Sequence, residues 1–204
     1  VRVLYYRLAL IISLSNDFLA QSTDAKLAEK GFTAGDISTI KGFEAEVRYL
    51  RAMAYWHAID LFRNVPLVTE ITSEPPSQAT PQATFDFIES ELNEVETELP
   101  DPRANEYGRV DKAAVWMLRA KLYLNSVVYT GVDKYAECVT EVNKVIGAGY
   151  ALEADYFANF RADNDQSSEL IFNFTSDGVS SQTWGGTTFL VHSMILDPMV
   201  PGDY

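Results

Sequence analysis

The residues best suited to chemistry lie in a polar loop near the end of the sequence, where a tryptophan stands beside two glycines. This run starts at Gln182, has Trp184 at its centre and reaches Thr187, and Asp177 precedes it. A tryptophan held in such a loop offers a flat ring that stacks on the C–H face of a sugar. The side chains of Gln182, Thr187 and Asp177 then supply hydrogen bonds to sugar hydroxyls. Packing of Trp184 against the rest of the protein is the alternative that the sequence leaves open.

The sequence does not contain a recognisable metal site. Its two histidines, His57 and His192, are far apart in sequence and no H-E-x-x-H motif is present. His57 lies on the apolar stripe of a predicted helix and is interpreted as a core histidine. Oxygen-bearing residues alternate from 163 to 169 as in an EF-hand, but Ser168 and Phe174 stand where that loop needs glycine and a bidentate acid. We predict no metal and no cofactor, with isolated oxygen ligands for calcium left open.

Enzymatic motifs are also missing from the sequence, which has no G-x-S-x-G, P-loop or G-x-G-x-x-G. Acidic residues are numerous, but most lie on the polar faces of predicted helices, where carboxylates are solvated. A glycosidase needs two facing carboxylates about 5–9.5 Å apart, and nothing in the sequence places such a pair. We therefore expect a protein that is not an enzyme. The single Cys138, in the middle of a predicted helix, is interpreted as a small core residue.

The composition is that of a folded protein with an acidic surface. Of its 204 residues, 47% are apolar and 22% are charged, which excludes intrinsic disorder, and one cysteine excludes a disulfide scaffold. The net charge of −13 argues against nucleic-acid binding and against a polybasic contact with a membrane surface. A first residue other than Met, Val1, indicates a processed product or a fragment. The apolar stretch that follows carries Arg7 and is interpreted as too short to span a bilayer, hence as a buried amphipathic helix.

Helical periodicity dominates the first three quarters of the chain, where apolar residues recur every three or four positions. The expected helices are 2–20, a long one that starts at an Asp36 N-cap and ends before Pro66, 81–99, 111–130 and 133–146. Thr80, followed by proline, is the expected N-cap of the third, and Gly131 is the expected stop of the fourth. Val139 is expected to face inward in the fifth.

The pattern changes after Tyr150. Residues 169–175 alternate enough to predict a short strand, and residues 176–188 are rich in Gly, Ser and Thr, which predicts a loop. The predicted fold class is mainly α, with tetratricopeptide-like antiparallel helix pairs, a loop-rich segment and the short strand. The helices do not follow a strict repeat of about 34 residues. We expect residues 1–150 to form the helical-repeat part and residues 151–204 to start the loop-rich part.

An ordered set of motifs resembles the SusD/RagB family. The helix Phe43–Ala52 (FEAEVRYLRA) and the following DLFRNVPLV, residues 60–68, are similar to its A-E-x-R-[FY]-L-R-A helix and [FY]-G-[DN]-V-P turn. Further similar motifs are NDFL at 16–19, GRVDKAA at 108–114 and ELIF at 169–172. The similarity runs in order along nearly the whole chain. Arg63 departs from the family, which usually has a glycine after the aromatic residue.

The resemblance implies one SusD-like domain that binds carbohydrate without catalysis and starts its glycan-binding part at residue 151. Family members are surface lipoproteins of the Gram-negative outer membrane; the signal sequence and lipidated cysteine are absent from this chain. The implied partner is a TonB-dependent, SusC-like transporter, over which the protein sits as a lid. Sugars stack on exposed aromatic residues in the loop-rich half of starch-system members, where Trp184 lies.

Two further expectations accompany this interpretation. Arg48, Arg51 and Asp60 are expected to serve the scaffold or a surface that faces the transporter. The alternative function is a helical-repeat module that binds a protein or peptide and no sugar, and a concave groove lined by the helices would favour it.

Overall fold

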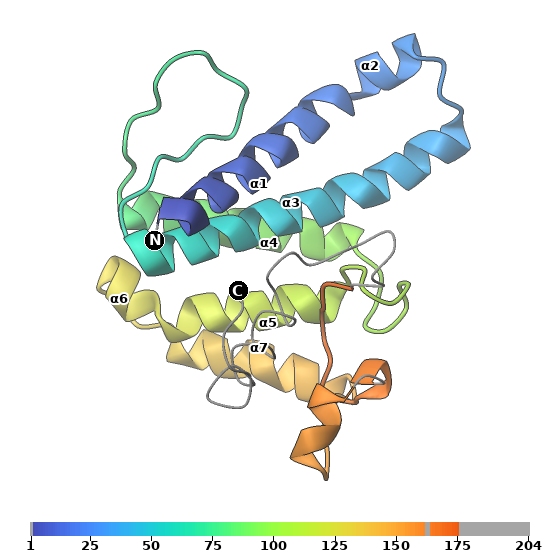
Figure 1. Cartoon of the computed structure of the whole chain (residues 1–204), viewed down its shortest axis with the longest axis vertical. Helices are drawn as coiled ribbons and strands as arrows, with labels where there is room; N and C mark the ends of the chain where they lie inside the picture. Colours follow the sequence, from blue (N-terminus) through green and yellow to red (C-terminus); the bar gives the residue numbers. More distant parts are fainter. Residues whose placement is uncertain (1, 162–163, 176–204) are drawn as a thin grey trace, which may run out of the picture. The chain divides into compact units, whose positions relative to one another are not determined.

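The computed structural model describes residues 2–161 and 164–175 (Figure 1). These residues form seven α-helices and two short 3₁₀-helices and contain no strand. The α-helices are α1 (Arg2–Gln21), α2 (Asp24–Glu29), α3 (Ala34–Phe62), α4 (Pro81–Glu98), α5 (Lys112–Leu124), α6 (Ser126–Thr130) and α7 (Tyr135–Gly147). The 3₁₀-helices are η1 (Tyr156–Phe160) and η2 (Asn164–Gln166). The predicted mainly α fold is confirmed.

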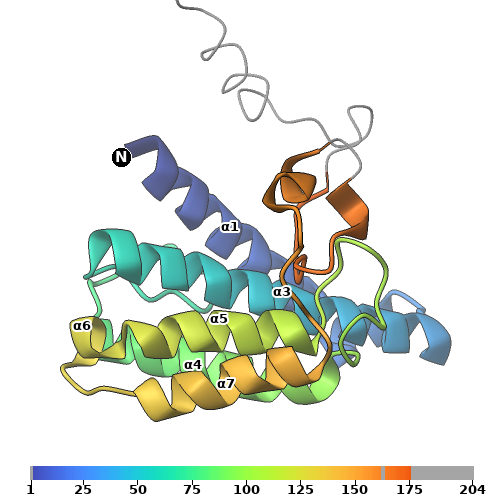
Figure 2. The same ribbon diagram turned by 90° about the horizontal axis from the view of Figure 1, so that it is seen from below.

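The long helices pack as neighbours in chain order. α1 packs on α3, α3 on α4, α4 on α5, and α5 on α7, and successive long helices run in opposite directions (Figures 1 and 2). Antiparallel helices joined in this order each bury one face against the previous helix and another against the next. A compact unit built in this way ends at Phe172.

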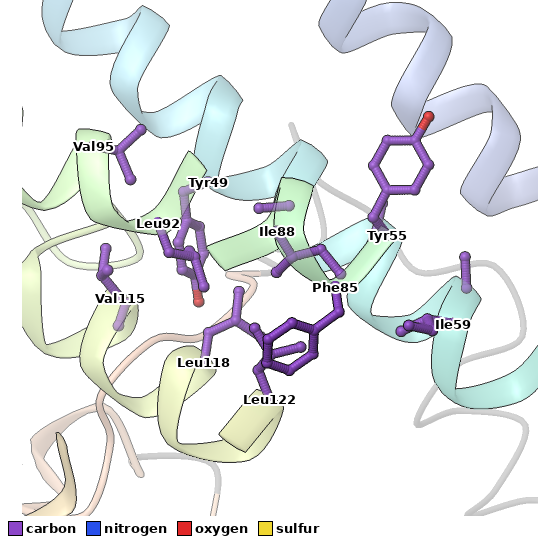
Figure 3. Close-up of a cluster of buried hydrophobic side chains, with 14 of the residues drawn as sticks. Tyr49, Tyr55, Ile59, Phe85, Ile88, Leu92, Val95, Val115, Leu118 and Leu122 are labelled. Carbon is purple, nitrogen blue, oxygen red and sulfur yellow. The ribbon is translucent and has the colours of Figure 1, made fainter. Parts of the chain in front are cut away.

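The core lies between α3, α4 and α5 (Figure 3). The stripe of apolar residues predicted for α4 is confirmed, because every member is buried. Its members are Phe85, Ile88, Leu92, Val95 and Leu99. Tyr49 of α3 faces it from one side, and Leu118 and Leu122 of α5 from the other, whereas Tyr55 of α3 points toward α1. A spacing of three and four residues places such side chains on one side of a helix, so α4 is held on that face by both neighbours.

Helix ends follow local signals, with one correction. The Thr80 hydroxyl accepts a hydrogen bond from the amide of Ala83, with Pro81 starting α4 as predicted, and Asp111 caps α5 by accepting from two amides. Gly131 ends α6 with φ 82°. The prediction that Asp36 is the N-cap of α3 was wrong. Thr33 is the N-cap, and Asp36 completes a capping box with it. The capping box extends the helix by one turn toward the N-terminus.

Two further predictions about the helices were wrong. The fourth predicted helix is broken at Asn125 into α5 and α6. The backbone of Asn125 is not helical, with φ −102° and ψ 11°. Val139 of α7 does not face inward: its exposed fraction is 59%, whereas Glu141 is buried. An ion pair with Arg119 of α5 draws Glu141 inward and so sets which face of α7 is buried. The sequence pattern also missed the short α2.

The predicted strand over residues 169–175 is wrong, because this segment consists of turns, bends and irregular chain. A strand needs a neighbour to receive its backbone hydrogen bonds, and none lies among the described residues. The apolar side chains serve the helical core instead. Phe172 packs edge-on against Tyr49, with ring centroids 5.5 Å apart, and Ile171 packs against the same core.

Helix α1 is buried on one side only. Leu8, Ile12 and Asn16 are buried on the side that packs on α3, whereas Leu10 and Leu14 are exposed on another side. With 20 residues, α1 is long and apolar enough by length and composition to cross a membrane, a test that core helices of soluble proteins also pass. The helix is longer than the apolar stretch on which the prediction was based, and burial is confirmed for one face only.

The backbone at Arg63 explains why a glycine is usual at this position in the family. Arg63 ends α3 with φ 61° and ψ −73°, and the amide of Asn64 donates to the carbonyl of Phe62 over 2.8 Å. This is a γ-turn of positive φ, which is strained for a residue with a Cβ atom. The Arg63 guanidinium also donates to the exposed carbonyl of Val128 over 3.1 Å.

We expect Arg63→Gly to raise the free energy of unfolding by about 1 kcal/mol, because relief of backbone strain exceeds the added entropy of glycine in the unfolded chain. Urea unfolding followed by circular dichroism measures the change. Arg63→Ala is the control, because it removes the hydrogen bond to Val128 and keeps the strain. Equal stability of the two variants would contradict the strain argument.

Candidate functional site

The four residues predicted to contact sugar lie outside the described residues. They are Asp177, Gln182, Trp184 and Thr187, and His192 also lies there. Their arrangement stays a prediction. The described part shows which of the other aromatic, ionisable and sulfur-bearing side chains have structural roles.

The other two tryptophans serve the scaffold. Trp116 is partly buried and its indole N–H donates to Oε1 of Glu96 over 2.6 Å. Trp56 is partly buried against the main core, with the Lys121 ammonium 5.5 Å from its ring. Of the three tryptophans in the sequence, Trp184 lies outside the described residues.

His57 and Cys138 have environments that fit their predicted scaffold roles. His57 is half-buried, and burial, together with the nearby charge of Lys121, lowers its pKa. Cys138 is half-buried against the main core, and burial raises the pKa of its thiol. Among the residues that the structure describes, no three His, Cys, Asp or Glu side chains are grouped so that they would hold a metal ion.

Arg51 and Glu91 form a buried ion pair between α3 and α4. Nη2 of Arg51 lies 2.7 Å from Oε2 of Glu91, and the two residues are 6% and 8% exposed. Nη1 of Arg51 donates to the side chain of Asn16 on α1 over 2.7 Å, and Arg48 donates to Glu91 from the adjacent turn of α3 over 2.9 Å. Asp60 also serves the scaffold, because its carboxylate accepts from the Tyr129 hydroxyl over 2.7 Å.

A second buried network joins α4, α5 and α7 around Arg119. Its guanidinium donates to Glu141 over 2.7 Å, to Asn93 over 2.7 Å and to Glu96. Lys144 approaches Glu141 within 2.9 Å. Charges buried in this way are tolerated because each has an opposite charge and hydrogen bonds.

These networks correct the interpretation of the acidic face of α4 as uniformly solvated. Glu91 is buried, and Glu89 and Glu96 are partly buried and paired with Lys134, which directly precedes α7, and with Arg119 of α5. Glu91 directly precedes Leu92 of the apolar stripe, so its place at the edge of that stripe was a signal for partial burial. The partner arginines lie on α3 and α5, and sequence periodicity within α4 carries no information about them.

The pKa of Glu96 predicts a contribution to stability against acid. Burial raises this pKa, but hydrogen bonds from Trp116 and Arg119 outweigh burial, so the net pKa lies below 4.5. A lowered folded-state pKa stabilises the fold above the unfolded value, and this stabilisation is lost as pH falls through the folded value. We therefore expect Glu96→Gln to flatten the fall in unfolding free energy between about pH 5 and pH 3.

Urea unfolding at several pH values measures this slope. Glu98→Gln provides the control, because it removes a carboxylate from the same helix that does not contact Trp116 or Arg119. A slope in Glu96→Gln as steep as in the unmodified chain would contradict the assignment.

Three side chains clamp the segment between α3 and α4, residues 64–79. The Tyr55 hydroxyl donates to the carbonyl of Val68 over 2.9 Å and accepts from its amide over 2.7 Å. The Asn16 amide donates to the same carbonyl over 2.9 Å, and Arg51 lies 3.4 Å from the carbonyl of Thr69. Asn16 and Arg51 belong to two of the motifs singled out in the sequence, and their shared task is to fix the course of this segment.

Comparisons with known proteins identify relatives of this chain. No family model matches the sequence. The chain is 39% identical over 191 residues to the starch-binding protein SusD of Bacteroides thetaiotaomicron. The aligned region covers 92% of this chain and 33% of that protein. The chain thus spans about a third of the length of this curated relative.

Solved structures share the fold. A laminarin-binding SusD-like protein superposes with a TM-score of 0.74 and 28% identity, covering 91% of this chain and 40% of the other. A SusD superfamily protein from Parabacteroides distasonis gives a TM-score of 0.64 at 28% identity, covering 76% of this chain and 33% of the other. The resemblance seen in the sequence motifs is therefore confirmed.

Proposed function

Because the chain is 39% identical to the starch-binding protein SusD along 92% of its own length, we propose that it belongs to the same family and is part of a non-catalytic glycan-binding protein. The observation that carries this proposal is its 39% identity to a protein named for binding starch. The similarity to a laminarin-binding structure agrees with it. Starch and laminarin are both polymers of glucose, so a glucan is the first ligand class to test.

In the proposed mechanism, Trp184 stacks on the C–H face of one sugar ring while Gln182, Thr187 and Asp177 bind its hydroxyls. The described helices take no direct part in the binding proposed here. The expected affinity is modest, roughly micromolar to millimolar, because a solvated sugar gains little from burial of apolar surface.

The proposal extends to uptake at the cell surface. A lipid-anchored protein of the outer membrane would capture the glycan and pass it to a TonB-dependent, SusC-like transporter. The family resemblance supports this step. The transporter contact also offers a role for surfaces of the helical part that do not touch sugar.

Affinity electrophoresis tests glycan binding directly. The chain is run in native gels that contain soluble starch, laminarin or no polysaccharide, beside a reference protein that binds no sugar. We expect starch or laminarin to retard the chain relative to the reference. Unchanged migration of a folded sample in both gels would overturn glucan binding by this chain and favour the protein-binding alternative.

A further inference from the structure

A groove runs between α1 and the clamped segment 64–79, which extends beside α1 in Figure 1. Two cavities form it, with volumes of about 270 Å³ and 390 Å³. They adjoin each other, because Ser13, Val68 and Thr72 line both. The sequence did not predict this groove.

The first cavity has mainly aliphatic walls. Leu8 and Ile12 of α1 form one side, and Val65, Pro66 and Pro76 of the clamped segment form the other. A volume of about 270 Å³ suits one large apolar side chain, which aliphatic walls stabilise by burial. A sugar, with hydroxyls around its ring, leaves those groups without partners against such walls.

The second cavity is acidic and has an exposed apolar rim. Asp17 and Glu70 line it, and the rim residues Leu14 and Ile71 are 60% and 62% exposed. Glu74 adds a third carboxylate at the first cavity. None of these three carboxylates has an ion-pair partner in the described part of the chain, in contrast to Glu91 on α4. Unpaired carboxylates beside an apolar cavity favour a cationic neighbour for the apolar group.

The groove is held open by the clamp at its floor. Tyr55 and Asn16 fix both backbone groups of Val68, whose side chain lines both cavities. A surface that is already ordered spends less free energy on binding than one that must fold around its ligand.

We propose that this groove binds an extended segment of a partner protein that carries a large apolar side chain next to a lysine or arginine. The apolar side chain fills the cavity of Leu8 and Ile12, and the basic side chain pairs with Asp17 and Glu70. This function is separate from glycan binding, and it stands or falls independently of Trp184.

A peptide titration followed by NMR tests the proposal. The probe is Ac-Gly-Leu-Lys-Leu-Lys-Gly-NH₂. Because leucine and lysine alternate along it, either leucine can enter the cavity with a lysine next to it. Two matched peptides replace both lysines by glutamate or both leucines by serine. We expect the first peptide to shift the amide signals of Ala9, Ser13 and Thr72, and each matched peptide to bind at least tenfold more weakly.

Two variants locate the binding. Ala9→Phe fills the first cavity and is expected to abolish the shifts, while Asp17→Asn with Glu70→Gln is expected to weaken binding about tenfold. The control, Glu29→Gln with Glu137→Gln, makes the same charge change at exposed sites on α2 and α7 and is expected to bind as the unmodified chain does.

Three outcomes would overturn the proposal. Equal binding of the lysine and glutamate peptides would remove the charge argument. Unchanged binding by a folded Ala9→Phe variant would remove the groove as the site. No shift with any peptide would show that the groove does not take a segment of this chemistry.

Discussion

Replacing Glu91 by alanine is expected to lower the free energy of unfolding by about 3–5 kcal/mol, because it leaves a buried charge without its partner. Arg51 is 6% exposed, and its Nη2 lies 2.7 Å from Glu91. Glu91 also binds Arg48 over 2.9 Å, so two guanidinium groups lose a partner at once. Arg51 further holds Asn16 and approaches Thr69, so the loss is expected to loosen the segment 64–79 as well.

Urea unfolding followed by circular dichroism measures this loss. Glu98→Ala is the matched control, because it removes a half-exposed carboxylate from the same helix that lies 3.7 Å from Arg48. We expect it to cost less than about 1 kcal/mol, as exposed ion pairs do. A Glu91→Ala variant as stable as Glu98→Ala would show that this pair does not hold α3 to α4.

The second large effect is expected at Trp184. If its ring forms the sugar platform, Trp184→Ala is expected to reduce glycan affinity about ten- to a hundredfold, because the stacked surface is lost. Trp184→Phe keeps an aromatic face and is expected to retain part of the affinity. Calorimetric titration of each variant with the same oligosaccharide measures the differences.

Trp116 supplies the matched control for this experiment. Trp116→Phe removes a partly buried indole whose N–H binds Glu96, so it is expected to lower stability and leave glycan affinity unchanged. The opposite pattern at Trp184, lower stability with unchanged affinity, would show that its ring packs the loop instead of binding sugar.

The parts of the fold that the sequence predicted are those set by local signals. The stripe from Phe85 to Leu99 was readable from its spacing, because the residues that share one helix face also share one neighbour. Thr80 and Asp111 act through amides three residues away or nearer. Such interactions need no knowledge of the rest of the chain.

The predictions that were wrong depend on partners far away in the sequence. Residues 169–175 have the composition of a strand, but no neighbouring strand receives their backbone in the described part of the chain. Val139 was expected to face inward, but Glu141 is buried in its place through its contact with Arg119, 22 residues earlier. Asn125 interrupts a continuous helical pattern that contains no glycine or proline, so the sequence contains no signal for the break.

The candidate sites differ in the same way. Trp184 was identified because a tryptophan beside glycines in a polar loop is a local pattern, and its role stays a prediction. The groove was missed because its two walls, represented by Asn16 and Val68, are 52 residues apart. The Asn16 and Arg51 motifs signalled that these residues mattered, although only the folded chain shows them clamping the same segment.

The measurement that tests the central claim most directly is a calorimetric titration of the unmodified chain with a linear starch oligosaccharide, repeated with one from laminarin. Circular dichroism of the same sample verifies that the helices are folded. We expect saturable binding of at least one oligosaccharide, with a dissociation constant in the range of roughly micromolar to millimolar. A folded sample that releases no heat of binding with either sugar, and that also fails to retard in the polysaccharide gels, would contradict glycan binding by this chain.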